Sequence, residues 1–311
     1  MGTKRDVNEY IGDTSINLQG YSMTIVDARN THDIDVMFDD NYNTVYQHKK
    51  LTDFYRGKIK NPNYLLGLEN IAFNGQKIRI VGGDATNLDI EFEDGTIVHN
   101  IRKENFDLGT VKNLNYRNIY GIGYIGYGKY NASEDNGKTG TIYSKWHGMF
   151  NRCYSPLFHA QEPTYRNCEV DESFHCLQDF GKWYEENVWD NNTIFHIEKD
   201  ILKKGNKLYS KDNCILTDRR INNLFISSQT YRGKYPIGVY EKNGKFDACC
   251  SILKKQKWLG SYPTPEEAFN SYKQFKESYI KQVADEYKSK YTNFPQKLYD
   301  AMYSYEVEIT D

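Results

Sequence analysis

Acidic, basic and amide side chains follow one another at short spacing between residues 195 and 225. An alternating run of apolar and polar residues ends in Glu198, Lys199 and Asp200, with His196 two positions before Glu198. Because side chains two apart in a strand share a face, we expect His196, Glu198 and Asp200 on one face and Lys199 on the opposite face. Two carboxylates beside an imidazole are suited to binding a cation and moving a proton.

The oxygen-bearing side chains of this stretch fit the hydrolysis of a phosphodiester bond. That reaction needs a cation to neutralise the leaving oxyanion and a base to activate water. Mg²⁺, or Mn²⁺ in its place, takes few protein oxygen ligands, and Glu198, Asp200 and Asn222 are the candidates. His196 is the candidate base near neutral pH. We expect the Asn213 side chain to orient the loop through hydrogen bonds to the backbone.

An ordinary hairpin is the alternative interpretation of the same residues. Asn at turns and Lys on an outer face are common in hairpins, and Asn213 caps a turn without any further role. A lone histidine such as His196 is more often a hydrogen-bonded strand residue than a base. The spacing alone therefore leaves a purely structural hairpin open.

The order of strand, loop, strand and helix over these residues resembles the HNH nuclease motif, in the divergent form of phage and mobile-intron homing endonucleases. Residues 210–214, Ser-Lys-Asp-Asn-Cys, are similar to one step of that motif, and Asn222 matches its last position. Upstream, the resemblance includes Trp146, Met149, Arg152-Cys153-Tyr154, Tyr165, Phe174, Phe180 and Trp183. It covers roughly residues 143–225 and implies a ββα nuclease domain that uses a metal ion to cut DNA.

One pair of residues departs from that motif. Glu198-Lys199 stands where the family has a histidine pair or Asp-His, so the usual general base is missing. Lysine is a poor base unless desolvation lowers its pKa. Three outcomes stay open: His196 replaces the base, Lys199 contacts only phosphate, or the site does not cut.

Two amphipathic stretches are expected to form helices that pack on this hairpin. Residues 142–158 carry aromatic and apolar side chains at helical spacing and end near Pro156. Residues 172–187 form the second predicted helix. Arg152 lies on the first helix, where it is a candidate phosphate contact, although a surface Arg is the commoner outcome.

Residues 232–260 predict three strands, with a tight hairpin turn at Asn243-Gly244. Thr264 then begins a helix with Pro265 in its first turn and Glu267 closing a capping box. The arrangement resembles the Apetala/ethylene-response-factor DNA-binding domain, on the segments Gly238-Val-Tyr240, Lys257-Trp-Leu-Gly260 and Thr264-Pro-Glu-Glu-Ala-Phe269. A small α+β domain with a solvated basic face is the alternative.

This resemblance implies that the sheet reads the major groove of duplex DNA. Lysines neutralise phosphates, and aromatic side chains pack on sugars and bases. The implied contacting set is Arg232, Lys234, Tyr240, Lys242, Lys245, Lys254, Lys255, Lys257 and Trp258.

An internal repeat occupies residues 10–116. Three pairs of segments match: 20–26 with 75–81, 35–40 with 89–94, and 54–61 with 106–113. Their period-2 alternation predicts two small β-rich barrels in tandem. Such modules would grip an extended DNA site, or else bind protein or act as spacers, which their acidic balance favours slightly.

Composition sets limits on the class of protein. The formal net charge is −2, but the basic residues are in excess in the C-terminal third. No apolar run is long enough for a membrane span, and no signal peptide is recognisable, so we expect a cytoplasmic protein, in a bacterial host if phage-encoded. The Gly spacing in 117–141 is not a dinucleotide fingerprint, and no organic cofactor is expected.

We therefore predict an α+β, multidomain protein, with tandem β-rich repeats at 10–62 and 63–116 and a linker at 117–141. An HNH-like nuclease domain at 142–230, an ethylene-response-factor-like domain at 231–291 and a tail at 292–311 follow. The predicted function is a metal-dependent DNA endonuclease of homing type that nicks or cuts duplex DNA. The alternatives are a non-catalytic DNA-binding regulator with a degenerate site, and a protein-binding phage inhibitor.

Overall fold

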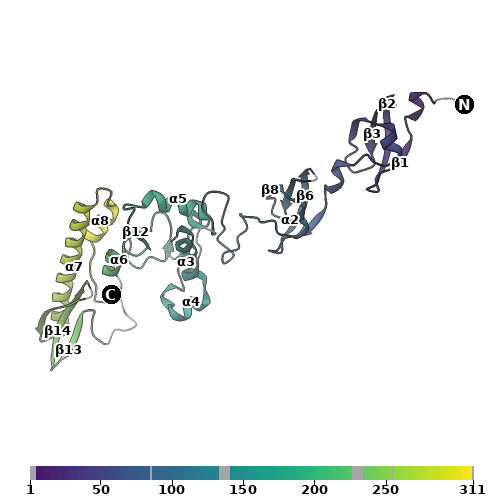
Figure 1. The fold of residues 1–311 in the computed structure, drawn as a ribbon. Helices are drawn as coiled ribbons and strands as arrows, with labels where there is room; N and C mark the ends of the chain where they lie inside the picture. Colours follow the sequence, from purple (N-terminus) through teal and green to yellow (C-terminus); the bar gives the residue numbers. More distant parts are fainter. Residues whose placement is uncertain (1–4, 85, 133–140, 226–233, 254, 310–311) are drawn as a thin grey trace. The chain divides into compact units, whose positions relative to one another are not determined.

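The computed structural model describes residues 5–84, 86–132, 141–225, 234–253 and 255–309 (Figure 1). The chain divides into two compact units, Met1–Asn113 and Leu114–Asp311. The architecture is mixed α+β, as predicted, and is built from several small antiparallel sheets and one two-stranded parallel sheet. In the described part of the chain, no helix has both the length and the apolar character needed to cross a bilayer.

The first sheet of the N-terminal unit has four antiparallel strands in chain order. They are β1 (Thr14–Ile16), β2 (Ser22–Asn30), β3 (Asp33–Phe38) and β4 (Val45–Lys49), preceded by the 3-10 helix η1 (Val7–Tyr10) and followed by α1 (Leu51–Tyr55). The alternating apolar residues of β2 and β3 are fully buried, which confirms the period-2 prediction for Met23, Ile25, Ile34, Val36 and Phe38.

The second sheet has the same strand order. Its elements are η2 (Pro62–Leu65), β5 (Glu69–Ile71), β6 (Lys77–Gly83), β7 (Leu88–Phe92), β8 (Ile97–Ile101) and α2 (Lys103–Asp107). Each sheet region contains an equivalent hydrogen bond, from an asparagine side-chain amide near the end of the region to an aspartate carboxylate that follows the third strand. Asn61 Nδ2 donates to Asp40 Oδ2 at 2.9 Å, and Asn113 Nδ2 donates to Asp94 Oδ2 at 2.7 Å. Both asparagines are buried.

The central part of the second unit packs short strands against helices. In chain order it contains α3 (Ile142–Tyr154), α4 (Pro156–Gln161), η4 (Pro163–Tyr165), β9 (Glu169–Val170), η5 (Glu172–Phe174), α5 (Leu177–Asn187), β10 (His196–Glu198), β11 (Leu208–Tyr209), β12 (Ile215–Thr217) and α6 (Arg219–Phe225). Strand β10 pairs antiparallel with β12, and β11 pairs parallel with β9. Helix α6 contacts both β10 and β12.

The two helices predicted around this hairpin are each broken near one end. The first stops at Tyr154, because Ser155 is extended and its side chain caps α4 by accepting from Phe158 N. The helical backbone conformation is disfavoured for a residue that precedes proline, which explains the break at Ser155. The second helix starts at Leu177, after the 3-10 turn η5. Residues 117–132 lie against the same core, where Tyr130 is buried. Residues 133–140 of the predicted linker lie outside the described residues.

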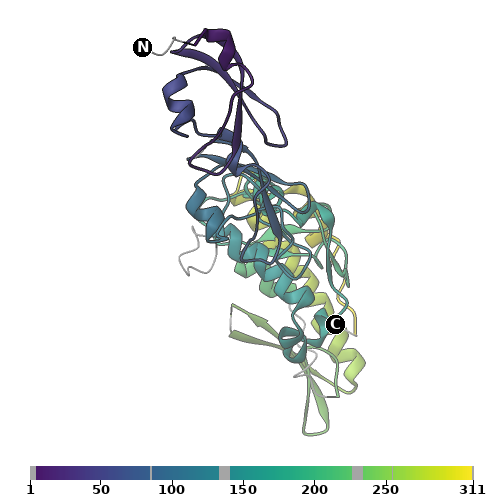
Figure 2. The ribbon, with the colours of Figure 1, turned by 90° about the vertical axis from the view of Figure 1, so that its right-hand side faces the viewer.

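The C-terminal sheet consists of β13 (Val239–Lys242), β14 (Lys245–Ile252) and β15 (Lys255–Tyr262). Asn243 and Gly244 both have positive φ in the β13–β14 turn, which confirms the predicted hairpin. Helix α7 (Pro265–Lys290) follows, and Thr264 caps it by accepting from Glu267 N at 3.2 Å, as predicted. Figure 2 shows this sheet and α7 beside each other.

Helix α7 contributes to two separate cores. Its first half buries Ala268 and Phe269 against the C-terminal sheet. Its second half buries Ile280 and Val283 in the central core, where α8 (Gln296–Tyr303) also packs through Leu298. The sheet and the central ββα arrangement therefore share one helix.

Candidate functional site

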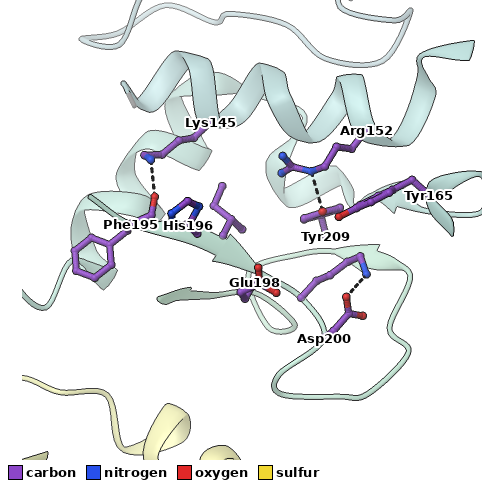
Figure 3. A pocket seen from close by; sticks show the side chains of 10 residues that line it. Lys145, Arg152, Tyr165, Phe195, His196, Glu198, Asp200 and Tyr209 are labelled. Carbon is purple, nitrogen blue, oxygen red and sulfur yellow. Dashed lines mark hydrogen bonds and ion pairs between the residues drawn. The ribbon is translucent and has the colours of Figure 1, made fainter. Parts of the chain in front are cut away.

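A pocket of about 170 Å³ opens between helix α3 and strand β10 (Figure 3). It is lined by Lys145, Arg152, Tyr165, Phe195, His196, Ile197, Glu198, Lys199, Asp200 and Tyr209. The lining combines an imidazole, two carboxylates, three cationic groups and two phenols. This concentration of titratable groups makes it the candidate functional site.

The structure brings His196, Glu198 and Asp200 to the same pocket. Strand β10 carries the first two, with His196 opposite Thr217 and Glu198 opposite Ile215 of β12. Antiparallel pairing with the buried strand β12 holds β10 in this register. The prediction that these three side chains lie together agrees with their shared position in the pocket lining.

Lys199 is not on the opposite, outer face, so that prediction is wrong. Strand β10 ends at Glu198, and the alternation of side chains does not extend to Lys199. Its ammonium is buried and donates to Asp200 Oδ2 at 2.6 Å and to the carbonyl of Asn206 at 2.7 Å. It also lies 5.8 Å from the ring centroid of Tyr165 and 5.9 Å from that of Tyr209. These contacts hold Lys199 in a structural position.

Two cationic side chains approach the pocket from helix α3, two turns apart (Figure 3). Lys145 Nζ donates to the carbonyl of Phe195 at 2.5 Å, directly before β10. Arg152 Nε donates to the hydroxyl of Tyr209 at 3.1 Å, and its two terminal nitrogens form no hydrogen bond with the part of the chain that the structure describes. The helix therefore presents positive charge opposite the carboxylates of Glu198 and Asp200.

The pKa values of the two titratable groups on β10 are shifted in opposite directions, upward for Glu198 and downward for His196. Burial, and then the neighbouring Asp200, raise the pKa of Glu198 to about 7. Burial, and then the positive charge of Lys145, lower the pKa of His196, so its imidazole is neutral near pH 7. While Glu198 is protonated, cations outnumber anions in the lining, which favours binding of a phosphate group.

The amide that organises the loop is Asn206, not Asn213. Asn206 Nδ2 donates to the carbonyls of Lys199 at 3.1 Å and Leu208 at 2.8 Å, and its Oδ1 accepts from Leu208 N at 3.2 Å. For Asn213, the backbone N–H donates to Ser210 Oγ at 3.2 Å. The side-chain role expected of Asn213 is therefore filled by Asn206, seven residues earlier.

The candidate metal ligands divide into two groups. Glu198 and Asp200 line the pocket, whereas Asn222 lies half-buried on α6 and is not part of the lining. Within the described ranges, no group of three or more His, Cys, Asp or Glu side chains is arranged to hold a metal ion. Two carboxylates still fit Mg²⁺, because this ion keeps several waters and takes one or two carboxylates from the protein.

Sequence reasoning did not assign a site role to Lys145, Tyr209 or Asn206. The spacing of seven between Lys145 and Arg152 was a usable signal, because residues seven apart share one face of a helix. The position of Tyr209 depends on the parallel pairing of β11 with β9, which brings together residues about 40 apart in the chain. No local pattern indicates such a pairing.

A second candidate surface is the outer face of the C-terminal sheet. Tyr240 is exposed on it, because it alternates with the buried Val239 along β13. Trp258 of β15 is exposed on the same face, since Tyr240 pairs with Asp247 and Trp258 with Cys249, two residues apart on β14. Lys242 and Lys245 pair with each other at the β13–β14 turn. Because side chains alternate along a strand, both point to the same outer face as Tyr240.

The remaining predicted DNA contacts lie elsewhere. Lys257 pairs with the buried Cys250, and its ammonium lies 4.5 Å from the ring centroid of Phe275 on α7. Lys255 is two residues from Lys257 on the same strand, so its side chain points to the same side of the sheet, the side that α7 packs against. Lys234 forms an ion pair of 3.9 Å with Glu241. Arg232 and Lys254 lie outside the described residues.

The pocket is small and is lined by both positively and negatively charged side chains. About 170 Å³ holds on the order of five water molecules, each of which occupies roughly 30 Å³ in the liquid. No family model, no curated protein and no solved structure matches this chain.

Proposed function

We propose that this protein is a DNA-binding, metal-dependent endonuclease that hydrolyses phosphodiester bonds in duplex DNA. The observation that carries the proposal is the pocket in which β10 presents Glu198, next to Asp200, opposite Lys145 and Arg152 of α3. In this proposal β10, β12 and α6 form the ββα unit of an HNH-like nuclease. Its homing type and its setting in a phage and its bacterial host are proposed from the motif resemblance alone.

Each pocket residue has a proposed role. Glu198 and Asp200 would hold Mg²⁺ or Mn²⁺, which supplies charge neutralisation for the leaving oxyanion. His196, neutral near pH 7, accepts the proton of the attacking water. Arg152 binds the phosphate through its free terminal nitrogens, and Lys145 adds positive charge at the start of β10.

Lys199 is proposed as a positioning residue and not as the base. Its buried ammonium holds Asp200 Oδ2, so the other carboxylate oxygen of Asp200 is left for the ion. Lys199 Nζ is engaged by two oxygen acceptors, Asp200 Oδ2 and the carbonyl of Asn206, so it is held away from an attacking water.

DNA binding is proposed for the outer face of β13–β15. Exposed Tyr240 and Trp258 supply stacking or sugar contacts, and Lys242 and Lys245 neutralise phosphates. The two N-terminal sheets would extend the contact along the DNA. Duplex DNA is thus the proposed partner of the whole chain, without any organic cofactor.

A cleavage assay on purified protein tests the proposal. Supercoiled plasmid and genomic DNA are incubated with Mg²⁺, Mn²⁺ or EDTA, beside a variant that carries Glu198→Gln and Asp200→Asn. We expect nicked or linear products with either ion, and none with EDTA or with the variant. Cleavage that survives in the double variant would remove the site assignment.

A non-catalytic DNA-binding protein is the second candidate, and the Lys199–Asp200 bond favours it. That bond occupies one oxygen of a carboxylate needed for the metal. DNA binding that weakens steeply with salt, without cleavage in any metal, would support this candidate. An absence of salt-sensitive DNA binding would instead support a protein-binding inhibitor, for which the described residues offer no specific feature.

A further inference from the structure

Helix α7 is anchored to the C-terminal sheet over its first three turns. Ala268, Phe269 and Tyr272 are buried there with residues of β13 and β14. Gly238 shows how close the approach is, because a Cβ at this position would lie 2.2 Å from the ring of Tyr272. The sheet therefore cannot shift along α7 without losing this packing.

The last turns of the same helix hold the N-terminus of α6. Arg220 donates two parallel hydrogen bonds to Glu286, of 2.6 Å to Oε1 and 2.8 Å to Oε2. Tyr287 donates from its hydroxyl to Asp218 Oδ2 at 2.5 Å. Asp218 Oδ1 accepts from Ile221 N at 2.8 Å, which caps the first turn of α6. Bidentate arginine–carboxylate pairs fix geometry as well as distance.

A buried tryptophan extends this contact to the strand behind the pocket. The ring of Trp189 lies 6.1 Å from that of Tyr287, and Trp189 Nε1 donates to the carbonyl of Leu216 at 3.0 Å. Leu216 lies on β12, opposite Ile197 of β10. Both elements that support the proposed catalytic strand are thus attached to α7.

The C-terminal tail forms a second connection between the same two parts. Val307 is buried with the sheet residues, and its N–H donates to Glu277 Oε1 at 2.8 Å. Two residues earlier, the ring of Tyr305 lies 4.8 Å from that of Phe225 at the end of α6. The tail therefore reinforces the connection that α7 makes.

The helix between these anchors is uninterrupted. Its 26 residues correspond to about 39 Å at 1.5 Å per residue. Pro265 stands in the first turn, and no further Pro and no Gly follows within α7. The usual causes of a kink are therefore absent from its interior.

From this continuous packing we infer that α7 determines specificity by fixing the distance between the DNA-binding face of β13–β15 and the pocket, so that cleavage occurs at a set distance from the bound sequence. The inference depends on the proposed endonuclease function. Arg220, Asp218, Glu286 and Tyr287 act as positioning residues, because they contact α6 and not the DNA or the ion.

The test maps the positions of cleavage on end-labelled DNA that carries a sequence selected by binding to the full chain. The first variant combines Arg220→Ala with Glu286→Ala. The second inserts Gly-Gly-Ser after Ser278, which lies between the two anchored halves of α7. The control is Gln282→Ala, an exposed position on α7 one turn before Glu286.

We expect the wild type and the control to cut at one position or a few adjacent ones. Both variants should bind the selected DNA with unchanged affinity but distribute their cuts over several additional base pairs. Cuts that stay at one position in both variants would overturn the inference while leaving the endonuclease function intact. Wild-type cutting without a set distance from the selected sequence would do the same.

Thermal unfolding separates this inference from the proposed function. If α7 couples the two parts, the wild type loses the structure of the sheet and of the central core in one transition, and the insertion variant in two. One transition in both proteins argues against the coupling even if the wild type never cuts DNA. A wild type that binds but does not cut overturns the endonuclease proposal and the cleavage distance with it.

Discussion

Lys199 and Asp200 are adjacent in the chain and are hydrogen-bonded through their side chains, with Nζ donating to Oδ2 at 2.6 Å. The same ammonium donates to the carbonyl of Asn206, whose amide in turn donates to the carbonyl of Lys199 at 3.1 Å. This reciprocal arrangement closes the loop between β10 and β11. It explains how a lysine can occupy the position after Glu198 without serving as the base.

Replacing Lys199 by Met should destabilise the protein by about 1–3 kcal/mol, because the carbonyl of Asn206 loses a buried donor. Methionine keeps most of the volume, so the effect reports the lost hydrogen bonds and not a cavity. Urea unfolding measures it, and Lys203→Met, at an exposed position in the same loop, is the control. Equal stability of the Lys199 variant and the wild type would contradict the structural role.

Replacing Glu198 by Gln should lower cleavage by roughly 10²–10⁴-fold, the range of a lost acid–base or ligand group. The change keeps the shape of the side chain and removes its charge. Because Glu198 lies in the pocket and not on the C-terminal sheet, DNA affinity should not fall. Single-turnover cleavage and a binding titration measure the two quantities, and a parallel loss of both would contradict the separation of binding from cleavage.

The stability of the protein should depend on pH through Glu198. Its pKa is raised to about 7 in the folded state, so the folded protein holds a proton that the unfolded chain loses above pH 4.5. The free energy of unfolding should therefore fall as the pH rises from about 4.5 to 7. The difference between the wild type and Glu198→Gln isolates this contribution, since the opposite contribution of His196 cancels.

The affinity for Mg²⁺ should also depend on whether Glu198 is protonated. Binding at Glu198 requires its carboxylate, so the affinity should rise about tenfold per pH unit below pH 7 and level off above it. Calorimetric titration at pH 5.5, 6.5 and 7.5 in two buffers of different ionisation enthalpy measures both the affinity and the released proton. An affinity independent of pH in this range would exclude Glu198 as a ligand.

Only side chains on the outer face of the C-terminal sheet should contribute to DNA affinity. Trp258→Ala should weaken DNA binding by about 1–3 kcal/mol, the usual contribution of one stacked base. Lys242→Ala should lower the slope of log affinity against log salt by about 0.9. Lys257→Ala should change neither, because its ammonium lies over Phe275 on the helix-covered side. An effect of Lys257→Ala as large as that of Lys242→Ala would show that the other face binds DNA.

Much of the fold follows from local patterns in the sequence. The alternation in β2 and β3, the Asn243-Gly244 turn and the cap at Thr264 each depend on residues close together in the chain. Such features are fixed by the conformational preferences of a few neighbouring residues. They were therefore predictable without knowledge of the tertiary structure.

The parts of the site that were not predicted depend on distant contacts. The end of β10 at Glu198 follows from its pairing with β12, which turned Lys199 inward. The role of Asn206 depends on the shape of the whole loop. The apolar stripe of α7 does not indicate that the helix packs into two cores, because a stripe predicts which face is buried but not which element covers it.

The matching bonds Asn61–Asp40 and Asn113–Asp94 have a consequence for how the N-terminal region can vary. Each sheet satisfies its own closing amide, and each carries its own glycine, Gly57 or Gly109, with positive φ before that amide. Loss or duplication of one whole module would therefore leave the closing hydrogen bond of the other in place. A change in the number of modules would therefore not break the closing bond of any module that remains.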